Sequence, residues 1–138
     1  MIVVDTNVIA YLLIAGQHTP AARATLLRDP EWAAPLLWRS EFRNVLALYL
    51  RKKQLTVAGA VSLCSAAESL LAGREHVVSS RDVLALASES GRSAYDCEFI
   101  AVARQLRQKL VTSDRSLLAA FPHDTVALDA FGADVAGS

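Results

Sequence analysis

The sequence predicts a three-layer α/β/α fold in which a mostly parallel, roughly five-stranded sheet lies between helices. Short runs of β-branched and apolar residues alternate with longer segments of 3.6-residue periodicity, which is the pattern of βαβ units. The 138 residues are 53% hydrophobic and 20% charged, which is enough apolar material for a core. No internal repeat or linker interrupts the pattern, so we expect residues 1–138 to form a single domain.

The first half of the chain predicts two strands and four helices. They are expected, in order, as a strand over 2–5, helices over 7–14 and 19–28, a strand over 32–35, and helices over 36–54 and 57–71. The run at 2–5 is apolar and β-branched, as in a buried strand. The segment LLWRSEFRNVLALYLRKKQ, residues 36–54, has the clearest amphipathic pattern. Thr56 is a suitable N-cap for the helix that follows, and Gly73 ends it.

The second half predicts three more strands and three more helices. They are expected, in order, as a strand over 76–79, helices over 82–90 and 94–108, a strand over 109–113, a short helix over 114–120, and a strand over 125–128. Gly91 separates the first two helices, and Ser93 is placed to cap the second. The tail FGADVAGS, residues 131–138, is expected to be loosely held.

Charge, cysteines and hydropathy bear on the partners and the cellular location of the protein. Fourteen basic residues balance 14 acidic ones, so net charge neither indicates nor excludes nucleic-acid binding. Cys64 and Cys97 fit no metal-ligand or redox spacing, which favours buried, reduced thiols. The longest apolar run, residues 8–15, is far shorter than the roughly 20 residues that span a bilayer. We therefore expect a cytoplasmic protein without a membrane or targeting segment.

Two aspartates follow expected strands. Asp5 closes the first strand and Asp114 follows the fourth, so both are expected at the carboxyl edge of the sheet, where sites form in parallel α/β folds. Helix capping explains each of them equally well when taken singly, because an aspartate before a helix accepts backbone N–H bonds.

Two further acids lie on helix faces that otherwise carry apolar side chains. Helical spacing groups Glu41 with Trp38, Phe42, Val45 and Leu48, and Asp96 with Phe99, Ile100 and Ala103. An unpaired carboxylate on such a face costs on the order of several kcal/mol, so it needs a cation, a hydrogen-bonding partner or solvent. Ser93 and Asp96 also have the spacing of a capping box, which explains one of the acids locally. Glu98 lies off that face and is expected to be solvated.

Four acids at one edge predict a metal site. They would raise one another's pKa values and destabilise the fold, and a divalent cation would remove that conflict. Oxygen ligands without a cysteine or histidine pattern favour Mg²⁺ or Mn²⁺ over zinc, and such an ion can activate a bound water. His18, His76 and His123 are scattered, and the sequence has no Ser-His-Asp order or glycine-rich phosphate loop.

The segments VVDTN, SEFRN, YDCEF and VTSDRSL resemble the four acidic signatures of the PIN-domain family, in the order and spacing of VapC-type toxins. The resemblance covers essentially the whole chain. It implies that Asp5, Glu41, Asp96 and Asp114 hold Mg²⁺ or Mn²⁺. It also implies an endoribonuclease that cuts RNA with metal-activated water and leaves a 5′-phosphate.

Roles for single residues follow from this resemblance. Asp5 and Asp96 are expected to bind the metal directly, whereas Glu41 and Asp114 act through water or complete a second metal position. Thr6, Asn7 and Thr112 are candidates to orient the carboxylates or the attacking water, with ordinary strand-end hydrogen bonding as the alternative. Arg115 is placed to reach the scissile phosphate, unless it is simply an exposed helical arginine.

Basic residues are needed to attract RNA to an acidic site. The candidates for phosphate contacts are Arg39, Arg43, Arg92, Arg115 and the run Arg51-Lys52-Lys53. Their alternative role is to stabilise helix ends and keep the protein soluble. Few exposed aromatic residues are evident, so shape recognition of a folded RNA is favoured over a stacking platform.

Partners and rival functions complete the sequence-based hypothesis. VapC-type relatives dimerise and are silenced by an antitoxin, so the resemblance implies a homodimer, a cognate antitoxin and an RNA substrate. A haloacid-dehalogenase-type phosphatase is one rival, but Asn7 stands where its second acid is required. A non-catalytic Mg²⁺-binding receiver or interaction domain is the other, but residues 79–81, Ser-Ser-Arg, stand where its aspartate should follow the third strand.

Overall fold

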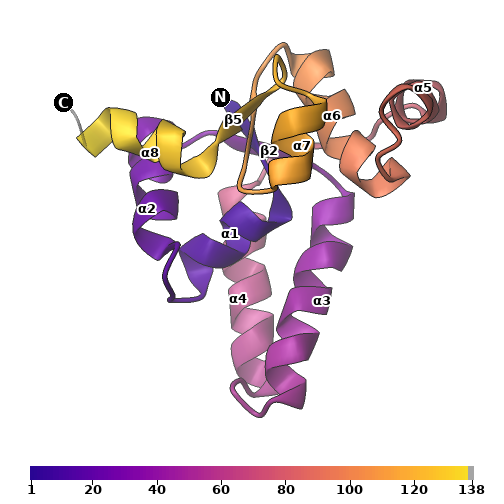
Figure 1. Cartoon of the computed structure of the whole chain (residues 1–138). Coiled ribbons are helices and arrows are strands. Elements are labelled where there is room, and N and C mark those ends of the chain that lie inside the picture. Colours follow the sequence, from indigo (N-terminus) through magenta and orange to yellow (C-terminus); the bar gives the residue numbers. More distant parts are fainter. Residues whose placement is uncertain (137–138) are drawn as a thin grey trace.

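The computed structural model describes residues 1–136 and contains one five-stranded sheet (Figure 1). Its strands, all parallel, lie in the order β3-β2-β1-β4-β5. They are β1 (Ile2–Val4), β2 (Trp32–Pro35), β3 (Glu75–His76), β4 (Leu110–Thr112) and β5 (Thr125–Ala127). The central strand β1 is buried throughout, and its Val3 pairs with Ala33 on one side and Leu110 on the other.

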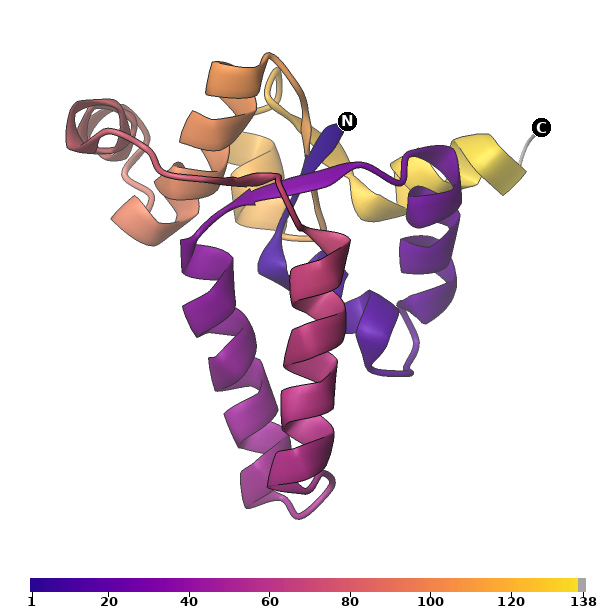
Figure 2. The same ribbon diagram turned by 180° about the vertical axis from the view of Figure 1, so that it is seen from behind.

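Helices cover both faces of this sheet and complete the three-layer α/β/α arrangement. They are α1 (Thr6–Leu13), α2 (Thr19–Arg28), α3 (Leu37–Arg51), α4 (Val57–Leu70), α5 (Ser80–Ser90), α6 (Ala94–Leu106), α7 (Arg115–Ala120) and α8 (Leu128–Ala136). Helix α6 packs on β1, β2 and β4, whereas α1 packs on α2, α3 and α4. Figures 1 and 2 show α3 and α4 side by side as a long hairpin, and α5 beside α6 at one end of the molecule.

The core is built from the apolar faces that the periodicity predicts, with one exception. Phe99, Ile100 and Ala103 are buried beside Asp96 on α6, as expected. On α3 the buried side chains recur at every fourth position, namely Trp38, Phe42 and Leu46. Leu48, which was expected on this face, is 46% exposed. The expected stripe was therefore wrong at this position, because α3 turns Leu46 rather than Leu48 toward the core.

Element ends differ from expectation where a local cap or turn decides them. Strand β3 stops at His76. Helix α5 starts at Ser80, because the Ser79 hydroxyl caps it by accepting from the Asp82 backbone N–H. Helix α3 ends at Arg51, and Lys53 then adopts a positive φ of 56° in the turn that leads to α4. Helix α5 ends at Ser90, and Gly91 follows with a left-handed φ of 71°, the conformation that glycine adopts freely.

The C-terminal segment is the main correction to the predicted fold. Residues 128–136 form α8, which packs along α2, whereas the tail was expected to be loosely held. A Cβ on Gly132 would lie 3.1 Å from the Ala21 carbonyl oxygen, so glycine here permits close helix packing rather than breaking the chain. The guanidinium of Arg28 lies 4.1 Å from the centre of the Phe131 ring and donates to the Phe131 carbonyl. Residues 137 and 138 lie outside the described part of the chain.

Two simpler expectations concern membranes and cysteines. Within residues 1–136, no helix combines the length and the apolar character that crossing a membrane requires. Cys97 is buried and Cys64 is partly buried, and both are free thiols.

Candidate active site

Parallel pairing of β1 and β4 brings Asp5 and Asp114 to the same edge of the sheet. Asp5 caps α1 through Oδ1, which accepts from the Thr6 N–H at 2.8 Å. Asp114 caps α7 in the same way, since its Oδ1 accepts from the N–H groups of Ser116 and Leu117. Capping thus accounts for one oxygen of each carboxylate. The cap leaves the second oxygen of each carboxylate to other partners, and Asp5 Oδ2 accepts from the Thr112 hydroxyl.

The four acids singled out in the sequence line one hollow of about 240 Å³, which we call the acidic pocket. Its lining consists of Asp5, Thr6, Asn7, Glu41, Asn44, Val45, Asp96 and Asp114. Asn44 was not predicted as a site residue. It lies three residues after Glu41, so helical spacing on α3 was the signal that could have identified it.

Two buried threonines hold carboxylates in place. The hydroxyl of Thr6 donates to Glu41 Oε1 at 2.7 Å, which ties α1 to α3. The hydroxyl of Thr112 donates to Asp5 Oδ2 at 2.8 Å and accepts from the Asp114 N–H at 3.0 Å. Each hydroxyl is a neutral partner, so it fixes the direction of a carboxylate without cancelling its charge.

The electrostatics of the pocket are those of crowded acids whose charges raise the pKa values of their neighbours. Burial raises the pKa of Asp5, and the charges of Asp96 and Asp114 raise it further against the hydrogen bonds from Thr112 and Thr6. Burial likewise raises the pKa of Glu41, where the hydrogen bond from Thr6 opposes the shift and the nearby acids add to it. The pocket therefore destabilises its own ionised form, which a bound cation would stabilise.

One arginine already contacts the acids. Arg92 Nη2 donates to Asp96 Oδ2 at 3.1 Å, and the Arg92 Nε is buried with no hydrogen-bond partner among the described residues. The capping predicted for Ser93 is also present, because its hydroxyl accepts from the Asp96 N–H at 3.0 Å. Asp96 thus lies in the first turn of α6 with one carboxylate oxygen held by a guanidinium.

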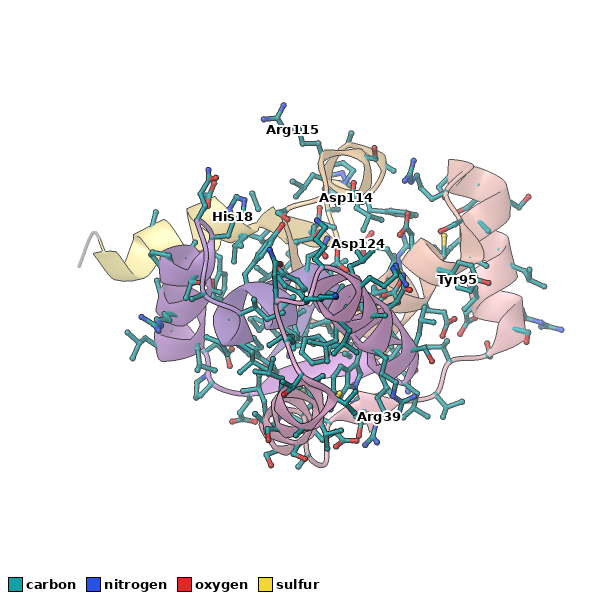
Figure 3. The ribbon with its side chains drawn as sticks, turned by 90° about the horizontal axis from the view of Figure 1, so that it is seen from below. His18, Arg39, Tyr95, Asp114, Arg115 and Asp124 are labelled. Atoms are coloured by element: carbon teal, nitrogen blue, oxygen red, sulfur yellow. The ribbon has the colours of Figure 1, made fainter. Side chains whose placement is uncertain are left out.

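Like Arg92, the other candidate RNA contacts are not among the residues that line the acidic pocket. Arg39 is held by two acids on the far side of α3, with Nε and Nη2 each 2.7 Å from Glu75 and Nη1 2.6 Å from Glu68. Figure 3 shows Arg39 and Asp114 on opposite sides of the molecule, with Arg115 pointing outward beyond Asp114. Arg43 is exposed on α3.

Glu98 lies closer to the acidic pocket than the sequence suggested. It was expected to be solvated, but it is only partly exposed, and burial raises its pKa. Its charge also contributes to the raised pKa of Glu41. Spacing along α6 could not indicate that Glu98 lies near Glu41, because Glu41 belongs to a different helix, α3.

The donor set fits a hard divalent cation in its chemistry. Four carboxylates and the side-chain amides of Asn7 and Asn44 line the pocket, and oxygen ligands of this kind suit Mg²⁺ or Mn²⁺. Within residues 1–136, no three acidic, histidine or cysteine side chains are already spaced to hold an ion. Binding would therefore require the carboxylates to draw together, and Arg92 would compete with the metal for Asp96 Oδ2.

Comparison with known proteins supports the three-layer α/β/α fold described above. A family model for the PIN domain matches residues 2–121. The crystal structure of PAE2754 from Pyrobaculum aerophilum is similar, with 23% identity, a TM-score of 0.76, and coverage of 99% of this chain and 96% of that chain. A toxin–antitoxin complex from Klebsiella pneumoniae is also similar, with 21% identity, a TM-score of 0.68, and coverage of 93% and 98%. No match is found among the curated proteins.

Proposed function

Because the chain belongs to the PIN domain family, we propose that it is a Mg²⁺- or Mn²⁺-dependent endoribonuclease and the toxin of a toxin–antitoxin pair. PIN domains are generally nucleases. The observation that carries the proposal is the convergence of Asp5, Glu41, Asp96 and Asp114 on one pocket at the carboxyl edge of the sheet. Neither the phosphatase nor the receiver domain requires Glu41 and Asp96 on helix faces.

In this mechanism Asp5 and Asp96 bind the metal directly, and Glu41 and Asp114 bind through water or complete a second metal position. When bound, the cation supplies an activated water and neutralises charge at the phosphate. Thr6 and Thr112 keep Glu41 and Asp5 oriented through the hydrogen bonds described above, and Asn7 offers an amide at the pocket wall. Hydrolysis adds water across a phosphodiester P–O bond and leaves a 5′-phosphate and a 3′-hydroxyl.

The basic residues divide into two groups in this proposal. Arg43, Arg92 and Arg115 contact RNA phosphates, Arg92 from the pocket edge and Arg115 from the start of α7. The guanidinium of Arg39 already donates hydrogen bonds to Glu75 and Glu68, which favours a structural role over the RNA contact expected from the sequence.

Exposed apolar surface and one structural neighbour support the proposed protein partners. That neighbour is described as a toxin–antitoxin complex, which supports a cognate antitoxin for this chain. Large apolar side chains are exposed on α4, at Val57 and Val61, and on α5, at Leu84. Surfaces of this kind suit a homodimer contact and an antitoxin contact in a cytoplasmic protein.

Metal binding tests the proposal before any RNA target is known. Calorimetric titration of Mn²⁺ should show binding by the parent protein, a large loss in Asp96→Asn and a smaller loss in Glu41→Gln. Glu89→Gln is the matched control, because Glu89 lies on α5 outside the acidic pocket. Unchanged binding in both pocket variants, or no binding by the parent, would contradict the mechanism. Mn²⁺-dependent cleavage of RNA by the parent and not by Asp96→Asn would then test the activity itself.

A further inference from the structure

A second hollow of about 260 Å³ lies beside the acidic pocket, between α1, the segment that joins α1 to α2, and α3. We call it the aromatic pocket, because Tyr11, His18 and Tyr49 line it. Asn7 and Val45 line both hollows, so the two adjoin at these residues. A strand bound with one phosphate at the acids would therefore place its neighbouring nucleotide at the aromatic pocket.

Flat π surfaces and neutral polar groups define the chemistry of this pocket. The rings of Tyr11 and His18 have centroids 4.5 Å apart at 36°, and both are partly exposed. Asn7 and Gln17 add side-chain amides that can donate to and accept from a base edge. None of the described residues that line it carries a carboxylate, ammonium or guanidinium group. The pocket therefore suits the neutral, aromatic part of a nucleotide, and the acidic pocket with its metal suits the phosphate.

The aromatic pocket is held in shape by hydrogen bonds. The buried hydroxyl of Thr19 donates to the Tyr11 carbonyl at 2.6 Å and accepts from the Gly16 N–H at 3.0 Å, which fixes the segment that carries His18. The Tyr11 hydroxyl lies 3.3 Å from Ser113 Oγ, next to Asp114. One aromatic wall is thus tied to the loop that carries an acid of the site. Figure 3 shows His18 and Asp114 on the same side of α3, away from Arg39.

We propose that the aromatic pocket binds one nucleobase of the RNA strand, next to the phosphate that is cut. The inference rests on the proposed nuclease function and adds a base-binding subsite to it. A base stacks against the partly exposed rings of Tyr11 and His18, while the amides of Asn7 and Gln17 contact the edge of the base. Spacing along the chain could not indicate this pocket, because Tyr11, His18 and Tyr49 come from three separate segments.

The test compares ligands with and without a base. The affinities of the four nucleoside 5′-monophosphates and of ribose 5-phosphate are measured with Mg²⁺ by NMR titration. We expect at least one nucleotide to bind about tenfold or more tightly than ribose 5-phosphate, which is the scale of one stacked base. His18→Gln should remove that preference without changing the affinity for ribose 5-phosphate, and His18→Phe, which keeps a ring, should retain it.

We expect His18→Gln to fold, because the His18 side chain makes no capping hydrogen bond at the start of α2. His123→Gln is the matched control, since His123 lines a different hollow, beside Lys109 and Asp124, and should leave the preference intact. Equal binding of all five ligands, binding of none, or a preference that survives His18→Gln would overturn the inference. Binding of N-acetyl-leucinamide but of no nucleotide would also overturn it and would indicate a protein partner instead.

Failure of this inference and failure of the nuclease proposal are distinguishable. Mn²⁺-dependent RNA cleavage that is lost in Asp96→Asn, together with no base preference, would remove the subsite alone. A base preference that depends on His18, together with no cleavage of RNA, would leave a nucleotide-binding pocket and contradict the nuclease.

Discussion

The hydroxyl of Thr112 donates to Asp5 Oδ2 at 2.8 Å, although 107 positions separate the two residues in the chain. Thr112 Oγ1 also accepts from the Asp114 N–H, so one buried hydroxyl connects the carboxylate after β1 to the loop after β4. The direction of the Asp5 carboxylate therefore depends on the pairing of β1 with β4.

Replacing this hydroxyl should reduce stability. Thr112→Val keeps the shape of the side chain but removes a donor to Asp5 and an acceptor for the Asp114 N–H, which should lower the free energy of unfolding by about 1–3 kcal/mol. Thr112→Ser, which keeps the hydroxyl, should be much closer to the parent protein. Urea denaturation measures both. Equal stability of the valine variant and the parent would show that the bond contributes nothing.

Removing one pocket charge should stabilise the metal-free protein. The pKa of Glu41 is raised by burial and by nearby acids, so the folded state binds a proton more readily than the unfolded state. The cost of ionising Glu41 is therefore absent at low pH and appears as the pH rises through its unfolded and then its folded pKa. Glu41→Gln should raise the thermal midpoint at pH 7 but not near pH 3. A lower midpoint for the variant at pH 7 would contradict this account.

Mn²⁺ should reverse that order of stability. The parent protein should gain more thermal stability than Glu41→Gln from the same excess of Mn²⁺, because the stabilisation by a ligand increases with the logarithm of its affinity for the folded state. Equal gains in both proteins would place the metal away from Glu41.

Arg92 should oppose metal binding while supporting RNA binding. Arg92→Gln removes a cation that holds Asp96 Oδ2 at 3.1 Å, so Mn²⁺ affinity should rise about two- to fivefold, the range of a partly exposed ion pair. RNA affinity should fall in the same variant if Arg92 contacts phosphates. Arg81→Gln, an exposed arginine on α5, is the control for loss of one positive charge. Weaker Mn²⁺ binding in Arg92→Gln would refute the competition.

The ion pair between Arg39 and Glu75 should make stability depend on pH in the opposite sense from Glu41. The hydrogen bond from Arg39 lowers the pKa of Glu75, and the Trp38 indole N–H adds a further bond. This stabilisation is present above the unfolded pKa of Glu75, near 4.5, and is lost as the pH falls through the lower folded pKa. Glu75→Gln should therefore cost about 1 kcal/mol at pH 7 and close to nothing near pH 2. Chemical denaturation at the two pH values distinguishes this from a cost that does not change with pH.

Local signals were sufficient for most of the fold and for the four acids. Helix α2 and strand β2 have the bounds that periodicity predicts, and Thr56, Ser93 and Gly91 lie at the helix ends where their chemistry favours them. The placement of Asp5 and Asp114 at one edge follows from a general property of parallel sheets. The element ends depend on residues within a few positions of one another, so the sequence alone determines them, whereas the shared edge also requires the pairing of β1 with β4.

The tertiary structure decided which side chains meet. Arg39 is held by Glu68 and Glu75, and α8 docks on α2 through Gly132, although neither partner is marked by local spacing. The aromatic pocket likewise exists only because α1, α2 and α3 converge. Periodicity gives the face on which a residue lies, whereas its partner depends on how separate elements pack. The sequence therefore determined the elements and the acidic residues, and packing between distant segments determined the contacts, charges and hollows around them.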